Sequence, residues 1–198
     1  MKKWFYTDDI HDNILINKQK FQLNTSYDNI FKLFHSMNNK NNVETFLKIM
    51  FFNRDYEKLK QETNDWSSKD YIDLINYITE EYIIEIDSNF ENTKTKYSDI
   101  YKDSEKIFTS FYYDYGISLI EKKGKMTWKE FLMLYNDLSE DSPLGKLVKI
   151  TRTPDKDLTD EGKRLKRERI SMLNENITID NQIDNLAKFL KATAKRDK

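Results

Sequence analysis

The sequence predicts a mainly helical protein: a small helical domain with a short N-terminal β-hairpin and an extended C-terminal helical segment. Its 198 residues include only 4 Gly and 2 Pro, too few for the many turns of a sandwich or barrel. They also include 12 Tyr, 12 Phe and 3 Trp, which is ample core material, whereas disordered chains are poor in aromatics. Several segments repeat apolar residues at the spacing of one helical turn.

The hairpin is predicted over residues 14–23, where β-branched residues and Phe-x-Leu alternation flank a polar tip at 17–20. A helix follows, and either Thr25 or Ser26 can cap it; if Thr25 is the cap, Asp28 is placed as the capping-box acceptor. Further helices of the first half are expected over 43–51, weakly over 55–66, and with the strongest periodicity over 67–82. A loop or hinge is expected over 87–96.

Start and stop signals define the helices of the second half. Gly116 is expected to end a helix over 107–115. Thr127 and Glu130 form a capping box for a helix whose Trp128 and Phe131 belong in the core. Another helix begins at Ser142 and Pro143, and its Gly145 allows close packing. By length we expect one main domain, a helical core over 1–152, with a charged C-terminal helical extension over 153–198.

Composition excludes several classes of protein. The chain has no Cys, which excludes disulfides, thiol nucleophiles and thiolate metal sites and fits a reducing cytosol. The 33 basic and 34 acidic residues give a formal net charge of −1, so the whole molecule has no field to attract nucleic acid or an anionic membrane. No stretch is long and apolar enough for a membrane span, and no secretion signal is expected. We therefore expect a cytoplasmic protein.

Known catalytic patterns are missing from the sequence. The two His residues, His11 and His35, lie in no zinc-binding pattern, and serine hydrolysis needs a base and a sharp glycine turn. The segment 142–146 resembles a phosphate loop but lacks its second glycine and the Ser or Thr after Lys146. Acidic pairs at 80–81 and 140–141 are typical of solvated faces or turns. We expect no catalytic residues, metal or cofactor, and so no enzyme.

A basic cluster lies beyond Pro154, in a segment expected to be an exposed helix. Its members are Lys163, Arg164, Lys166, Arg167 and Arg169. Such a cluster can contact phosphates, but the acids between 157 and 168 would oppose a polyanion. A solvated, salt-bridged face is the favoured interpretation, and nucleic-acid binding is the weaker one.

Two places are candidates for binding a protein partner. The first is a narrow apolar stripe, the C-terminal stripe, which is built to dock on a partner or on a second copy of the chain; it comprises Ile179, Ile183, Leu186 and Phe189. The second is the tyrosine pair, Tyr112 and Tyr113, which we expect to be partly exposed.

Four short motifs occur in a fixed order: Tyr-Gly-Ile at 115–117, Trp-x-x-Phe at 128–131, Ser-Glu-Asp at 139–141 and Gly-Lys at 145–146. With the segments around them, over residues 10–170, they resemble a family of siphophage proteins encoded in the tail module, between the major tail protein and the tape measure protein. The family often has a second aromatic residue beside the tryptophan, whereas Lys129 follows Trp128 here.

The resemblance implies a tail assembly chaperone, because genes at that position generally encode one. Such a protein would coat the tape measure protein, help to recruit tail tube subunits such as the major tail protein, and act in the host cytoplasm without entering mature virions. The alternatives are a structural or host-interacting helical phage protein and, with less support, a nucleic-acid-binding protein that uses the basic cluster.

Overall fold

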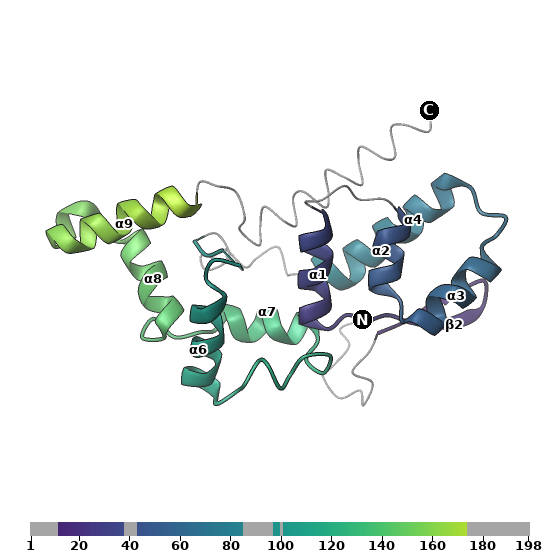
Figure 1. Cartoon of the computed structure of the whole chain (residues 1–198), viewed down its shortest axis with the longest axis horizontal. Helices are drawn as coiled ribbons and strands as arrows, with labels where there is room; N and C mark the ends of the chain where they lie inside the picture. The colour runs from purple at the N-terminus through teal and green to yellow at the C-terminus, as the bar shows by residue number, and fades with distance from the viewer. Residues whose placement is uncertain (1–11, 38–42, 85–96, 100, 174–198) are drawn as a thin grey trace. The chain divides into compact units, whose positions relative to one another are not determined.

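The computed structural model describes residues 12–37, 43–84, 97–99 and 101–173, and these are mainly helical (Figure 1). They contain eight α-helices and a two-stranded antiparallel hairpin, which confirms the predicted fold class. The chain divides into two compact units, which we describe separately. Of the described residues, unit 1 holds 12–37, 43–84 and 123–131, and unit 2 holds 97–99, 101–122 and 132–173.

The predicted hairpin is present in unit 1 as β1 (Asn13–Ile16) and β2 (Gln19–Gln22). Its turn is shorter than the predicted polar tip, because only Asn17 and Lys18 connect the strands. Both have positive φ, 50° and 66°. Left-handed residues at both central positions are what the tightest two-residue turns require. One face of the hairpin is buried through Phe21 and the isoleucines of β1.

Four α-helices follow the hairpin in unit 1, each near its predicted position. They are α1 (Tyr27–Met37), α2 (Val43–Met50), α3 (Asn53–Glu62) and α4 (Ser68–Ile78), and a π-helical stretch, η1 (Thr79–Ile84), continues α4. The start of α4 is fixed by a capping box: Ser67 accepts from the Asp70 N–H, and the Asp70 carboxylate accepts from Ser67 N–H at 2.8 Å. The periodic segment 67–82 is therefore helical, as predicted.

α1 begins at Tyr27, so Ser26 and not Thr25 directly precedes it, and the capping box expected for a Thr25 cap with Asp28 is not formed. Asp28 instead accepts a hydrogen bond from the Gly124 N–H at 2.8 Å, and the Thr25 hydroxyl is buried without a partner among the described residues. The cause is a backbone bridge between residues far apart in sequence. The Trp128 N–H donates to the Thr25 carbonyl at 2.7 Å, so the start of α1 lies beside the start of α7 (Trp128–Asn136).

An aromatic cluster around Trp128 forms part of the core of unit 1. The Trp128 ring stacks on Phe131 at a centroid distance of 5.5 Å and meets the edges of Phe31 and Phe34 at 5.7 and 5.6 Å. A buried indole N–H needs a hydrogen-bond acceptor. Trp128 Nε1 has one, because it donates to the Ile83 carbonyl at 3.2 Å. Trp128 and Phe131 are fully buried, which confirms their predicted core position.

Unit 2 is built from α6 (Ser104–Tyr115), the second part of α7, α8 (Pro143–Arg152) and α9 (Asp160–Leu173), with a short 3-10 turn, η2 (Asp155–Asp157), before α9. The predicted end of α6 and the predicted start of α8 are both confirmed. Gly116 adopts the left-handed conformation at φ 65° and ends α6. Ser142 caps α8 by accepting from the Gly145 N–H at 3.1 Å, with Pro143 at the first helical position.

None of the helices in the described ranges is long and apolar enough to cross a membrane. The loop predicted over 87–96, the C-terminal stripe and His11 lie outside the described residues. The predicted division into a core over 1–152 and an extension over 153–198 stays a prediction.

Candidate functional site

The tyrosine pair lies at the C-terminal end of α6 and points to solvent. Tyr112 is 68% exposed and Tyr113 is 62% exposed, values uncommon for side chains of this size. The opposite side of α6 is buried through Ile107, Ser110 and Phe111. The expected exposure is therefore confirmed, whereas binding of a partner there stays a prediction.

Hydrogen bonds to neighbouring segments of unit 2 hold the end of α6 in place. The Ser110 hydroxyl accepts from the Leu144 N–H at 2.8 Å. The Asp114 carboxylate accepts from both the N–H and the hydroxyl of Ser139, at 2.8 and 2.7 Å. Because α6 is fastened on this side, the tyrosine pair is displayed on a rigid element and not on a loose loop.

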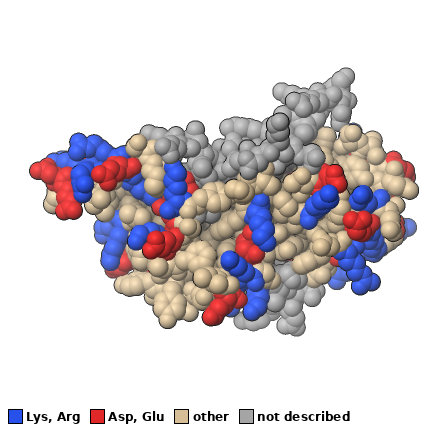
Figure 2. Space-filling model, viewed as in Figure 1, with Lys and Arg blue, Asp and Glu red and all other residues tan. Residues whose placement is uncertain are grey.

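Tyr115, next to the pair, is a structural tyrosine and differs from the pair in its contacts. Its hydroxyl donates to the Leu134 carbonyl at 2.8 Å, and burial, with a smaller contribution from Asp137, raises its pKa to about 12. Unit 2 also exposes two large apolar side chains that the sequence analysis did not single out, Ile120 and Met133. In Figure 2 the surface over the C-terminal end of α6 is mostly uncharged.

The basic cluster lies on α9, as expected, but one of its members is not on the surface. Arg169 is only 8% exposed, so its assignment to an exposed basic patch is wrong. The physical reason is a buried carboxylate: both guanidinium Nη atoms bind the two oxygens of Asp103, and Nη2 also donates to the Tyr97 carbonyl at 3.1 Å. The fork geometry of Arg suits such a bidentate contact.

Three other members of the basic cluster are paired with carboxylates on the surface. Lys163 pairs with Asp160, Arg164 with Glu168, and Lys166 with Asp155, at 3.3, 3.6 and 2.8 Å. The Lys166 ammonium lowers the pKa of the Asp155 carboxyl through a hydrogen bond and through its charge. Figure 2 accordingly shows blue and red side chains interspersed over α9. These ion pairs favour the salt-bridged interpretation over a phosphate-binding surface.

The buried Arg169 belongs to a polar cluster that the sequence analysis missed. Asp103 Oδ2 accepts from the Asp99 N–H at 2.8 Å, and Asp99 Oδ1 accepts from the N–H groups of Tyr101 and Lys102 at 2.8 and 2.9 Å. The cluster therefore ties α9 to the segment before α6. The sequence does not reveal such a residue, because a buried Arg within a run of charged residues has the same sequence neighbours as an exposed one.

The residues weighed for metal or acid–base chemistry lie exposed on separate elements in the described part of the chain. No set of three His, Asp or Glu side chains within those ranges is arranged to hold a metal ion. His35 lies exposed in the last turn of α1, and the acidic pairs Glu80–Glu81 and Glu140–Asp141 are also exposed. Glu140 pairs with Lys149 at 3.0 Å.

The chain matches the family model described as "Bacteriophage Gp15 protein" over residues 7–178. Since this match spans most of the chain, the chain belongs to that family and is a bacteriophage protein. No curated protein and no solved structure matches it.

Only one of the two candidate binding sites lies within the residues that match the family model. The tyrosine pair lies inside the matched residues, whereas the C-terminal stripe begins at Ile179, just beyond their end at residue 178. A function common to the family is therefore better sought at the tyrosine pair.

Proposed function

We propose that this chain is a non-enzymatic tail assembly chaperone, which coats the tape measure protein and helps to recruit tail tube subunits, the major tail protein among them. It would act in the host cytoplasm and be absent from mature virions. Two observations support the proposal: membership of a bacteriophage family over residues 7–178, and the resemblance of the motifs between residues 115 and 146 to those of tail-module proteins.

The observation that carries the proposal is the exposure of the tyrosine pair on a rigid helix. Tyrosine offers a large apolar ring with a polar tip, so it can contact an apolar stripe and still remain compatible with water. Exposed apolar surface on a monomer commonly marks a site of protein contact. Tyr112 and Tyr113 are therefore the residues that we assign to the partner.

A surface of this kind can cover the apolar stripes of a tape measure protein. Such a protein is a long, largely helical chain, and its apolar stripes would associate with one another before the tail tube encloses them. Each chaperone copy buries a short length of stripe and binds weakly. Many copies bound side by side keep the complex together by avidity, and each can still be displaced as the tube grows.

The test is affinity purification of the tagged full chain from cells that express the phage tail genes, with bound proteins identified by mass spectrometry. We expect the tape measure protein to be the main partner. Changing Tyr112→Ser and Tyr113→Ser together should reduce its recovery on the order of tenfold, as loss of a contact hot spot does. Tyr77→Ser on α4 is the matched control, because Tyr77 is also an exposed tyrosine on a helix.

The same experiment separates the alternatives. A parallel variant, Ile183→Asp with Phe189→Asp, tests the C-terminal stripe, and light scattering at several concentrations tests self-association. Recovery of host proteins alone, or of nucleic acid in a salt-dependent manner, would contradict the chaperone proposal. Finding the chain in stoichiometric amounts in purified virions would favour a structural tail component instead.

A further inference from the structure

The helix α9 is docked without a buried apolar side chain. Arg169 is the one residue buried along its length. Its apolar residues Leu165 and Ile170 are exposed, and Met172 and Leu173 are only half-buried. Although α9 packs against α8, none of its apolar side chains is fully buried, so polar contacts contribute much of its attachment.

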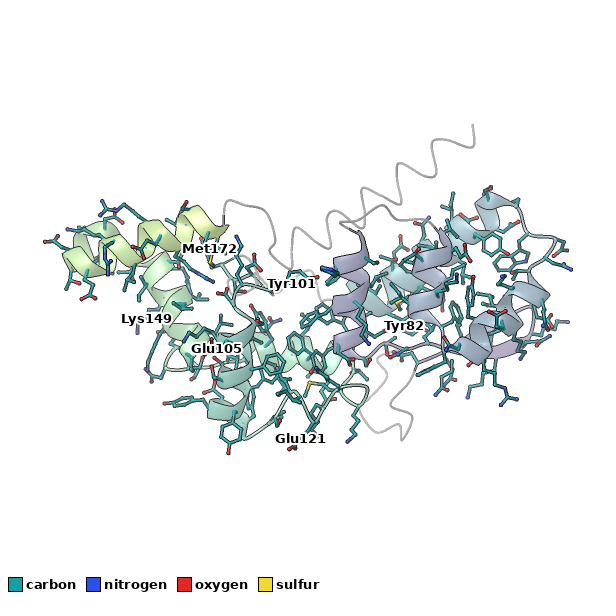
Figure 3. The ribbon with its side chains drawn as sticks, viewed as in Figure 1. Tyr82, Tyr101, Glu105, Glu121, Lys149 and Met172 are labelled. Carbon is teal, nitrogen blue, oxygen red and sulfur yellow. The ribbon has the colours of Figure 1, made fainter. Side chains whose placement is uncertain are left out.

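These contacts converge on the segment before α6. Besides the bonds from Arg169 to Asp103 and to the Tyr97 carbonyl, Lys102 Nζ donates to the Met172 carbonyl at 3.2 Å. In Figure 3 the labelled Met172 lies on the end of α9 that approaches the segment before α6, which carries the labelled Tyr101. The other end of α9 follows the break at Thr153 and Pro154, where Lys166 Nζ donates to the Thr153 carbonyl at 2.8 Å.

A buried ion pair holds such a helix with little net energy. Removing both charges from water costs nearly as much as their attraction returns. Here the cost is higher, because Arg169 Nε and Asp99 Oδ2 are buried without hydrogen-bond partners among the described residues. Release of α9, which returns both charges to water, therefore costs less free energy than release of a helix held by a buried apolar face.

We propose that Asp103 and Arg169 form a clasp, which closes to dock α9 on the segment before α6 and opens to release α9 while α6 and α8 stay folded. The clasp is a conformational device in its own right, and it operates whether or not the chain binds a tape measure protein.

Hydrogen exchange of the full chain, followed by mass spectrometry, tests the clasp. In the wild type, α9 amides should exchange faster than those of α6 and α8, and low denaturant should leave their rate unchanged, as for a local opening. Asp103→Asn keeps an oxygen acceptor for the Asp99 N–H but removes the charge. It should raise exchange in α9 on the order of 100-fold, because it leaves Arg169 buried and unpaired.

Three further variants sharpen the result. Arg169→Gln breaks the same pair without touching α6, so it should reproduce the effect of Asp103→Asn. Arg169→Lys keeps the charge but not the fork, so its effect should be intermediate. Arg167→Gln, which removes an exposed charge from the same helix, should change nothing.

Two outcomes would overturn the proposal. In the first, α9 keeps its wild-type protection in both Asp103→Asn and Arg169→Gln, which would mean that the pair does not hold the helix. In the second, α6 and α8 lose protection together with α9, which would make the pair a structural support of the whole unit.

Discussion

The Cα of Gly145 faces the carbonyl of Ser139 so closely that a Cβ built on Gly145 would lie 2.0 Å from that oxygen. The same Cβ would be 2.8 Å from the Cα of Glu140, so the obstacle is backbone and not a movable side chain. This approach lets Ser142 cap α8 directly after the turn that also bonds Asp114. The predicted close packing at Gly145 is therefore confirmed.

Gly145→Ala should destabilise unit 2 by about 2–3 kcal/mol, because the backbone has to shift to admit the methyl group. Urea unfolding followed by far-ultraviolet circular dichroism measures the change. Gly162→Ala in α9 is the matched control: its Cβ would meet only the side chains of Leu158 and Thr159, at 3.3 Å, and alanine favours a helix. Equal stability of the two variants would contradict the backbone argument.

Trp128→Phe should destabilise unit 1 by about 1–3 kcal/mol, because it leaves the Ile83 carbonyl without the indole donor and opens a gap in the aromatic cluster. Chemical denaturation with circular dichroism is the measurement. Trp66→Phe serves as the comparison, because Trp66 is only half-buried and pairs with a single ring, Tyr71. A larger loss from Trp66→Phe would mean that the core is centred elsewhere.

Lys18→Gly should stabilise unit 1 by about 0.5–1 kcal/mol. Lys18 holds φ at 66°, where a side chain is strained, and Asn-Gly is the preferred pair for this two-residue turn. Thermal unfolding measures the gain. Lys20→Gly, on β2 and within the paired strand, should instead destabilise the hairpin. A destabilised Lys18→Gly variant would show that the turn does not have this conformation in solution.

Stability should fall in alkaline solution. Burial raises the pKa of Tyr27, Tyr101 and Tyr115 to about 12, above the value of 10.0 for a tyrosine in water. The folded chain therefore binds more protons than the unfolded chain between these values. The stabilisation is fully present below pH 10 and is lost as the pH rises from about 10 to 12.

Denaturation at a series of pH values, with phenolate absorbance recorded in parallel, checks this prediction. Tyr115→Phe removes one of the three groups, so its stability should decline less steeply over the same pH range. A decline of the same steepness would show that Tyr115 does not titrate with unfolding.

The sequence predicts well where structure is decided by neighbours along the chain. The end of α6 at Gly116 and the start of α8 at Ser142 were both predicted, because the capping interactions lie within a few residues. The roles of Asp28 and Arg169 were not. Their partners, Gly124 and Asp103, are 96 and 66 positions away, and no local pattern indicates which distant group will lie beside a charged side chain.

The candidate site was likewise predicted only in part. Tyr112 and Tyr113 were expected to be partly exposed, and they are. Ile120 and Met133 were missed, because an apolar residue within an apolar segment is ordinarily assigned to the core. Exposure of such residues depends on where the rest of the fold ends, which only the packed structure shows.

The backbone bridge between Ser26 and Thr127 has a consequence for synthesis on the ribosome. The hairpin and the first four helices emerge long before Trp128, whose ring packs against Phe31 and Phe34 of α1. Until then, the backbone before α1 lacks its partner at Thr127, and Phe31 and Phe34 lack the indole ring that they pack against. The core of unit 1 is therefore completed only after the segment that begins α7 has been synthesised.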